Sequence, residues 1–439
     1  MFRPLFLLSV AVRVALGFVV NNGTSCYVFP ESISHSGQPV DDTPSILQAF
    51  DLCGINGSVI LTNSTFYVDQ VMNTTNLLNC DVSLLGEMIW STNVPYWLSH
   101  SYDVVFQNLS TAWLFGGTNV TFKGYGQGRF NGQGQVWYDE NRNNSNQPGR
   151  PIAITFYNST NLFVDGLTWS QPQFWHSFIS HSNNVTVTNV HMNATSDDGN
   201  ITVNTDGTDT WNSRDIKLQN WTVQNGDDCI AVKGNTTNLY VNNVTCYGSG
   251  GMPIGSVGQY PQKPDYVENI LFENIVLHDS SSAAWIKTWP GRNAPTTSNG
   301  DSGGGGSGYV KNVTFRNFDC INVSQPIYVT QCIYASDPSI CDTSLVQISD
   351  ITWQNISGTS SYDVAASIHC SSSVPCPGLE FVDVNITSVN ATRGLRNSNV
   401  GTLGERYLCA NIVNENTTSG IPCDGWAPSD FPQRLTMNY

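Results

Sequence analysis

Charged side chains are scarce in this chain of 439 residues, because Asp, Glu, Lys and Arg together make up only 12% of it. The basic residues are the fewest: 18 Lys and Arg stand against 34 Asp and Glu, which gives a formal net charge of −16. A chain with so few cations lacks the basic surface by which proteins bind nucleic acids or anionic membranes. A small acidic ligand remains compatible with this charge, because one or two local cations suffice to bind it.

Long apolar runs are also missing beyond the N-terminus, where no segment has the roughly twenty apolar residues of a membrane-spanning helix. At the N-terminus itself, Arg3 precedes an apolar run over residues 4–12, and the small residues around Ala15 and Gly17 offer a cleavage site. This pattern is typical of an export signal. We therefore expect residues 1–17 to be a signal peptide and the rest to be secreted and extracellular, without membrane contact. A buried first strand is the competing interpretation.

The twelve cysteines include no Cys-X-X-Cys metal pattern. In the oxidising environment outside the cell, the close pairs Cys229/Cys246 and Cys370/Cys376 are candidate disulfides. Roughly twenty Asn-X-Ser/Thr sequons point to the same compartment, because they are acceptors of N-linked glycans. They include Asn63, Asn73, Asn184, Asn235, Asn312 and Asn385.

A short sequence motif typical of a strand, called here the strand phrase, recurs along the chain. Each copy alternates apolar and polar residues with a period of two and is bounded by turn residues, as half-buried β-strands are. The clear copies begin at Asn119, Asn161, Asn184, Asp215, Asn238, Asn269 and Asn312, and weaker ones begin at Val346 and Leu379.

The spacing of these copies indicates the architecture. Two intervals, Asn161 to Asn184 and Asp215 to Asn238, are each 23 residues, and others run from 31 to 43. Repeats of this length without helical patterns between them predict a β-solenoid. We therefore expect an all-β, single-domain, right-handed parallel β-helix over residues 18–439, with loops of different length between strands. A β-propeller and a β-sandwich are the competing folds.

Three acidic residues lie one coil apart: Asp206, then Asp227 and Asp228, the last of them 22 residues further on. Equivalent residues on successive coils of a β-helix lie about 4.8 Å apart, so the three carboxylates should meet. Their repulsion raises the pKa of at least one group, which supplies the protonated acid and ionised base of glycoside hydrolysis. Asp227 and Asp228 can share one face only at a bend. A calcium site and a ladder of turn-capping aspartates are the competing interpretations.

The aspartates belong to four ordered motifs, which are Gly126-Gln-Gly-Arg-Phe-Asn131-Gly-Gln-Gly134, Asn204-Thr205-Asp206-Gly207, Gly226-Asp227-Asp228-Cys229 and Ile254-Gly255-Ser256-Val257-Gly258. In this order and spacing they resemble the family 28 glycoside hydrolases, the polygalacturonases. The resemblance extends from about Cys26 to Cys423. The segment from Asp206 to Trp211 and the cysteines near the C-terminus are most similar to the fungal exo-acting members.

The resemblance implies an inverting hydrolase of pectin without a metal or organic cofactor, acting as a monomer on pectic polysaccharide or oligogalacturonide. It implies that Asp227 is the general acid and that Asp206 and Asp228 hold and deprotonate the attacking water. Asn204, Lys287 and Tyr328 match positions that bind the sugar. Exo-cleavage of terminal α-1,4-linked galacturonic acid is the leading expectation.

Two departures from the family pattern concern the sugar site. Gly250 stands where polygalacturonases carry the His of Gly-His-Gly, and Trp285 stands where they carry the Arg of Arg-X-Lys. Replacing Arg by Trp removes a carboxylate partner and adds an apolar stacking surface, so Trp285 is a candidate for substrate binding. The departures favour a rhamnogalacturonan hydrolase or an α-L-rhamnosidase as the alternative function. His176 or His181 filling the gap left at Gly250 is the competing interpretation.

Other features leave further interpretations open. Trp175, Trp211 and Trp289 are additional candidates to line a sugar groove. The glycine run from Gly303 to Gly308 is expected to form a loop that borders the cleft and closes one of its ends, and a closed end favours exo action. It lacks the Lys-Ser/Thr of a phosphate loop. A non-catalytic carbohydrate-binding β-helix is the alternative of another class, and a pectate lyase, which needs calcium and a basic proton acceptor, is a further one.

Overall fold

The computed structural model describes residues 17–31, 39–104, 106–142, 147–292, 303–335, 338–361, 364–388 and 406–413. Residues 1–16 of the expected signal peptide and the cysteine at 423 lie outside the described residues. In the described part of the chain, no helix is both long and apolar enough to cross a bilayer.

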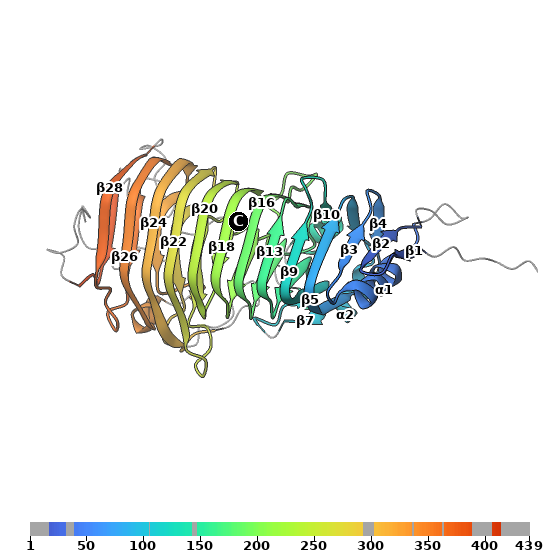
Figure 1. The fold of residues 1–439 in the computed structure, drawn as a ribbon. Coiled ribbons are helices and arrows are strands. Elements are labelled where there is room, and N and C mark those ends of the chain that lie inside the picture. The colour runs from blue at the N-terminus through green and yellow to red at the C-terminus, as the bar shows by residue number, and fades with distance from the viewer. Residues whose placement is uncertain are drawn as a thin grey trace, which may run out of the picture.

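The predicted coil is confirmed: the chain winds into a right-handed parallel β-helix whose long strands lie side by side along its whole length (Figure 1). One wall is built from the long strands, each in parallel register with the next. These strands are β5 (Met72–Leu84), β9 (Trp113–Lys123), β13 (Thr160–Asp165), β16 (Asn183–Asn193), β18 (Arg214–Gln224), β20 (Thr236–Tyr247), β22 (Asp265–His278), β24 (Ser307–Val323), β26 (Leu345–Ser360) and β28 (Leu379–Ser388).

A second wall consists of short strands that precede the long ones on each turn of the coil, here called a rung. They are β12 (Ile154–Tyr157), β15 (Ser177–Ser180), β17 (Thr208–Trp211), β19 (Ile230–Val232), β21 (Met252–Val257), β23 (Ser282–Thr288), β25 (Gln325–Thr330), β27 (Val364–His369) and β29 (Arg406–Ala410). They pair in parallel from rung to rung. This short-strand wall carries the candidate site.

The long strands bend partway, which adds a third side to the coil. The first half of β16 pairs with β13, whereas its last residues pair with β14 (Thr168–Ser170), which in turn pairs with β10 (Arg129–Asn131). The bend lies at Asn189, whose φ of 55° is left-handed. Asn tolerates this conformation better than most residues, which explains why Asn recurs at the corners.

Asparagine ladders run along two corners. Asn161 donates to Asn119 and Asn184 donates to Asn161, each through Nδ2 and each at 2.8 Å. On the second corner Asn220 donates to Asn189 at 3.1 Å, and Asn243 donates to Asn220 at 2.9 Å. The Asn residues that begin the sequence phrases are therefore the corner residues. The sequons at Asn184 and Asn312 place their Nδ2 atoms inside a ladder.

The interior is filled by stacks of aliphatic side chains from successive rungs. One stack, aligned by the strand register, is Val120, Leu162, Val185, Ile216, Leu239, Ile270, Val313, Ile351 and Leu379. All of these side chains are buried, and each burial contributes about 1.5–3 kcal/mol of hydrophobic stabilisation. The apolar positions of the period-two phrase thus form the core.

The N-terminal end of the coil is covered by α1 (Thr43–Cys53), which lies across the first rungs (Figure 1). Its Phe50 packs edge-on against Trp113 and Phe115. A cover of this kind protects the open edge of a solenoid from pairing with other chains. The other elements of this end are β1 (Phe18–Asn21), β2 (Ser25–Phe29), β3 (Ser58–Leu61), β4 (Thr65–Val68), β6 (Glu87–Trp90) and α2 (Val94–His100).

Smaller elements lie beside the coil. A three-stranded sheet is formed by β7 (Tyr102–Asp103), β8 (Ser110–Thr111) and β11 (Pro151–Ile152), and α3 (Gln135–Glu140) and a 3-10 helix, η1 (Pro338–Thr343), lie in loops. Both predicted disulfides, Cys229–Cys246 and Cys370–Cys376, are present. Cys26–Cys53 and Cys332–Cys341 are formed as well.

Candidate active site

Asp206, Asp227 and Asp228 come together at the N-terminal ends of the short strands β17 and β19. Carboxylate oxygens of the three lie within 4.8 Å of one another. Asp227 and Asp228 occupy the turn between β18 and β19 rather than a strand, so both can face the same side. The bend that the sequence required is therefore present.

Two polar side chains hold the turns that carry the aspartates. Asn225 donates from Nδ2 to the carbonyls of Thr205 and Asp228, each at 2.9 Å, which ties two adjacent rungs together. The hydroxyl of Thr205 accepts from the Gly226 amide at 3.1 Å. These bonds fix the backbone on both sides of the cluster.

The carboxylate of Asp227 accepts three hydrogen bonds. The backbone N–H of Asn204 donates to it at 3.0 Å, the Asn204 amide at 3.4 Å and the backbone N–H of Asp228 at 2.9 Å. Burial and the neighbouring charge of Asp228 outweigh these bonds and raise the pKa of Asp227 to about 6. Asp227 is half-buried, whereas Asp206 and Asp228 are almost fully buried.

Asp206 is also shifted toward its protonated form. Burial raises its pKa well above the ordinary value, and the negative charges of Asp209, Asp227 and Asp228 add to this effect, while Lys233 opposes it. The cluster therefore retains protons at a pH at which isolated carboxylates are ionised.

Lys287 neutralises one member of the cluster. Its Nζ lies 2.7 Å from Oδ2 of Asp228, and both side chains are about 95% buried or more. Burial alone would lower the pKa of Lys287, but the charges of Asp228, Asp227 and Asp206 together raise it. The ammonium is therefore held in its charged form next to the Asp228 carboxylate.

Two glycines make room for this pair. Lys287 lies one rung beyond Gly255 in register, and a Cβ on Gly255 would come within 2.9 Å of its Cγ, so the lysine stem lies across this glycine. A Cβ on Gly250 would lie 2.5 Å from Oδ1 of Asp228. Both glycines leave space that the ion pair occupies.

Buried polar atoms without hydrogen-bond partners gather around the carboxylates. In the described part of the chain these include Oδ1 of Asp206, Asp228 and Asn204, and Nε2 of His176. Buried polar atoms are normally satisfied by protein or water. A group of unsatisfied acceptors at one place is the arrangement expected of a site that binds a water molecule and a hydroxylated ligand.

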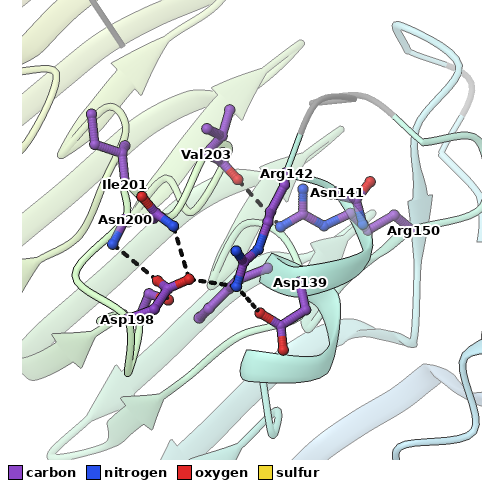
Figure 2. A pocket seen from close by; sticks show the side chains of 10 residues that line it. Asp139, Asn141, Arg142, Arg150, Asp198, Asn200, Ile201 and Val203 are labelled. Atoms are coloured by element: carbon purple, nitrogen blue, oxygen red, sulfur yellow. Dashed lines mark hydrogen bonds and ion pairs between the residues drawn. The ribbon is translucent and has the colours of Figure 1, made fainter.

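A pocket of about 380 Å³ lies beside α3, and its lining extends to Val203, the residue before Asn204. Figure 2 shows Arg142 from the end of α3 between Asp139 and Asp198, and Arg150 donating to the Val203 carbonyl. Arg150 is buried, and its charge acts on both Asp227 and Asp206. The pocket is thus lined by two guanidinium groups, of which Arg150 acts on the cluster.

Comparison with known proteins assigns the family of this site. A family model described as "Glycosyl hydrolases family 28" matches residues 91–404, more than half of the chain. The chain belongs to glycosyl hydrolase family 28.

Individual family 28 relatives cover nearly the whole chain. The α-L-rhamnosidase rgxB of Aspergillus niger is 37% identical over 426 residues, covering 96% of this chain and 95% of that protein. The exopolygalacturonase of Cochliobolus carbonum is 34% identical over 390 residues, covering 87% and 83%. The solved structure of the endo-xylogalacturonan hydrolase from Aspergillus tubingensis has a TM-score of 0.74 at 24% identity, covering 94% of this chain and all of that one, which supports the fold.

Gly250 and Trp285, the two positions that depart from the family 28 pattern, have neighbours that the structure defines. Neither His176 nor His181 takes the place of the His that Gly250 replaces. His176 is fully buried and directs Nδ1 at the carbonyl of Asp206, 3.0 Å away, and burial lowers its pKa to about 4, so it is neutral. His181 packs between the rings of Tyr157 and Trp211 at the opposite ends of the strands.

Trp285 and Tyr328 stack on each other with ring centroids 5.6 Å apart, and they are 2% and 4% exposed. The segment closed by the Cys332–Cys341 disulfide packs against them and Trp289. Trp285 also lies under the Lys287 ammonium, with Nζ 4.1 Å from the ring centroid. The open stacking surface expected of Trp285 is therefore covered by protein, and its ring contacts the lysine.

The remaining groove candidates differ in exposure. Trp175 and Trp289 are buried, and Trp211 is partly exposed with Phe106 stacked on it at 4.6 Å. Within the glycine run, Gly304 donates to the carbonyl of Gln259, beyond the C-terminal end of β21. The run therefore lies at the other ends of the short strands from the aspartates.

Two groups at the site were not predicted from the sequence. Arg150 follows a loop without any recognisable pattern. The buried ion pair of Asp209 and Lys233 lies at 3.2 Å between the rungs of Asp206 and Asp228. A charged residue inside an alternating strand was the available signal for Asp209, because a charge there must either face solvent or have a partner.

Proposed function

We propose that this chain is an exo-acting hydrolase of pectin that removes terminal α-1,4-linked galacturonic acid with inversion of configuration. The observation that carries the proposal is the cluster of three carboxylates within 4.8 Å, with one of them paired to Lys287. Glycoside hydrolysis requires a protonated acid at the leaving oxygen and an ionised carboxylate at the nucleophile.

Asp227 is the general acid in this proposal. It is the most exposed of the three, so it can reach a glycosidic oxygen, and its pKa of about 6 keeps it protonated in mildly acidic solution. Asp206 and Asp228 bind the attacking water through their unsatisfied Oδ1 atoms and take its proton. Asn204 positions Asp227, and Lys287 holds Asp228 in place through an ion pair at 2.7 Å.

The distance between the carboxylates bears on whether hydrolysis inverts or retains the anomeric configuration. Inverting enzymes generally separate acid and base by about 6.5–9.5 Å to admit water, and retaining ones by about 5–5.5 Å. Here the cluster is tighter, but two carboxylates flank one acid. A water held jointly by Asp206 and Asp228 occupies the nucleophile's place, which is why inversion is proposed.

The arginine-lined pocket supports a carboxylated sugar. Arg142 and Arg150 both line it, the charge of Arg150 acts on Asp227 and Asp206, and guanidinium groups bind carboxylates with two parallel hydrogen bonds. Arg142 also links α3 to the loop at Asp198, and we propose that this link closes one end of the site. An enclosed end favours release of single terminal residues.

A second candidate is hydrolysis of α-L-rhamnosides or of rhamnogalacturonan. Gly250 and Trp285 favour it, because they replace the His and the Arg that the family pattern places there to bind a carboxylated sugar. The similarity to a protein named as an α-L-rhamnosidase favours it as well.

Substrate tests separate these candidates. Purified protein is incubated with oligogalacturonate, rhamnogalacturonan oligomers and an aryl α-L-rhamnoside, and the products are analysed by chromatography. Free galacturonate without unsaturated product supports the leading proposal. Release from only the rhamnose-containing substrates supports the second. An unsaturated product would indicate a lyase, and no turnover with retained binding would indicate a carbohydrate-binding protein.

We further propose that residues 1–17 direct export, that residues 18–439 form one catalytic domain, and that the secreted protein is a monomer on pectic substrates. The disulfides favour an oxidising compartment. Sequencing the N-terminus of the secreted protein and measuring its mass in solution test these points.

A further inference from the structure

A second ion pair is buried on the same two rungs as the aspartate cluster. Asp209 in β17 is fully buried, and Lys233, which follows β19, is only 6% exposed. Their charged atoms lie 3.2 Å apart. Lys233 also lies over the ring of Trp175, with Nζ 5.4 Å from the centroid. The pair is therefore enclosed by protein rather than by solvent.

Stability alone does not account for this pair. Apart from Lys233, neither carboxylate oxygen of Asp209 has a hydrogen-bond partner in the described part of the chain, so the lysine is their main compensation. Burying two charges costs several kcal/mol each, and apolar residues of similar size commonly do as well or better. A charge pair kept in this environment points to a role for the charges themselves.

The position of the pair indicates which group it affects. Asp209 lies three residues after Asp206 on the same rung, and Lys233 lies five residues after Asp228 on the next. Among the neighbouring charges that raise the pKa of Asp206, the charge of Asp209 has the largest effect, and the charge of Lys233 lowers this pKa. The other charged groups that act on Asp206 are Asp227, Asp228, Lys287 and Arg150, and the neutral His176 contacts its backbone carbonyl.

We propose that Asp209 and Lys233 form a positioning pair whose balanced charges control whether Asp206 carries a proton during hydrolysis. The pair touches no reacting atom and acts through Asp206. Asp209 favours retention of the proton, and Lys233 limits that effect so that Asp206 can still act as a base with Asp228. This inference rests on the proposed hydrolase function.

The test compares the pH dependence of kcat on the substrate that the wild type cleaves. Asp209→Asn removes the negative charge at nearly constant shape and leaves Lys233 to favour the ionised form of Asp206. The acidic limb of the profile should therefore move to lower pH, by on the order of one pH unit. The double variant Asp209→Asn/Lys233→Met removes both charges and should return the limb toward the wild-type position.

Matched controls separate this effect from damage to the fold. Glu273→Gln makes the same charge change in the ion pair with Arg316, which lies on the long-strand wall, and should leave the profile unmoved. Asp209→Ser repeats the charge change with a smaller side chain should Asp209→Asn fail to fold.

The outcomes are distinct. A lower limb in Asp209→Asn that the double variant restores supports the inference. Reduced kcat or Tm with an unmoved limb would mean a structural role only, and a raised KM with an unmoved limb in the double variant would mean that Lys233 binds substrate; either result overturns it. A wild type without hydrolase activity on any substrate would instead refute the proposed function.

Discussion

Removing the Lys287 ammonium should be far more damaging than removing an equivalent cation elsewhere. In Lys287→Met the carboxylate of Asp228 stays almost fully buried, loses its partner at 2.7 Å and already has one oxygen without a hydrogen bond. Breaking a buried ion pair from one side costs about 3–5 kcal/mol. In a chain of this length we expect Tm to fall by roughly 5 °C.

Activity should fall as well, because Asp228 loses the ammonium that holds its carboxylate in position beside the attacking water. General base catalysis contributes about 10²–10⁴-fold, and the loss of kcat should lie in that range. The assay combines thermal unfolding followed by circular dichroism with initial rates on oligogalacturonate.

A matched control is Arg316→Met, which breaks a pair with Glu273 whose side chains are 37% and 19% exposed. Such partly solvated pairs contribute about 0–1 kcal/mol, so Tm and kcat should hardly change. The double variant Lys287→Met/Asp228→Asn should regain stability without regaining activity. Equal losses of Tm in Lys287→Met and Arg316→Met would refute the reasoning.

Three further predictions follow from the same contacts. Burial raises the pKa of Asp227 and of Asp42 from 3.8 to about 6. Their contribution to stability is therefore complete below about pH 4 and is lost as the pH rises through about 6. Tm should be higher at pH 4.5 than at pH 7, and an equal or lower value at pH 4.5 would contradict this. Because Asp227 must be protonated to act as the acid, kcat/KM should fall as the pH rises through about 6, and a rate that keeps rising past pH 7 would argue against that role. Asn220→Ala loses two ladder bonds and leaves Ala at a φ of 59°, which should cost about 2–3 kcal/mol in denaturant unfolding, whereas Asn220→Gly should cost less.

The fold could be predicted because its rules act locally along the chain. Asn161 and Asn184 take left-handed corner conformations that few residues tolerate, and the alternating residues after them fill a core stack. The interval between two such residues then gives the coil length. Because Asp206 and Asp228 are separated by about the same interval, the sequence alone is enough to expect them on neighbouring rungs.

The surroundings of the site could not be predicted in the same way. The burial of Trp285 depends on the Cys332–Cys341 segment, which follows β25 on the next rung and folds back onto the Trp285 ring. Arg150 is held by bonds to the carbonyls of Gln173 and Val203 where its charge acts on Asp227 and Asp206, and no side-chain pattern reveals these bonds. Both sets of contacts are made by loops between strands, and the spacing of the strand repeats does not predict the conformation of those loops.

The most direct test of the account is the configuration of the first sugar released. Proton NMR of the anomeric signals during early hydrolysis of an α-1,4-linked oligogalacturonate distinguishes the two outcomes before mutarotation. Water held by Asp206 and Asp228, with Asp227 as the acid, predicts that the β-anomer appears first and that Asp227→Asn releases none. First appearance of the α-anomer would contradict the account, because it would mean that one of the clustered carboxylates attacks the sugar directly.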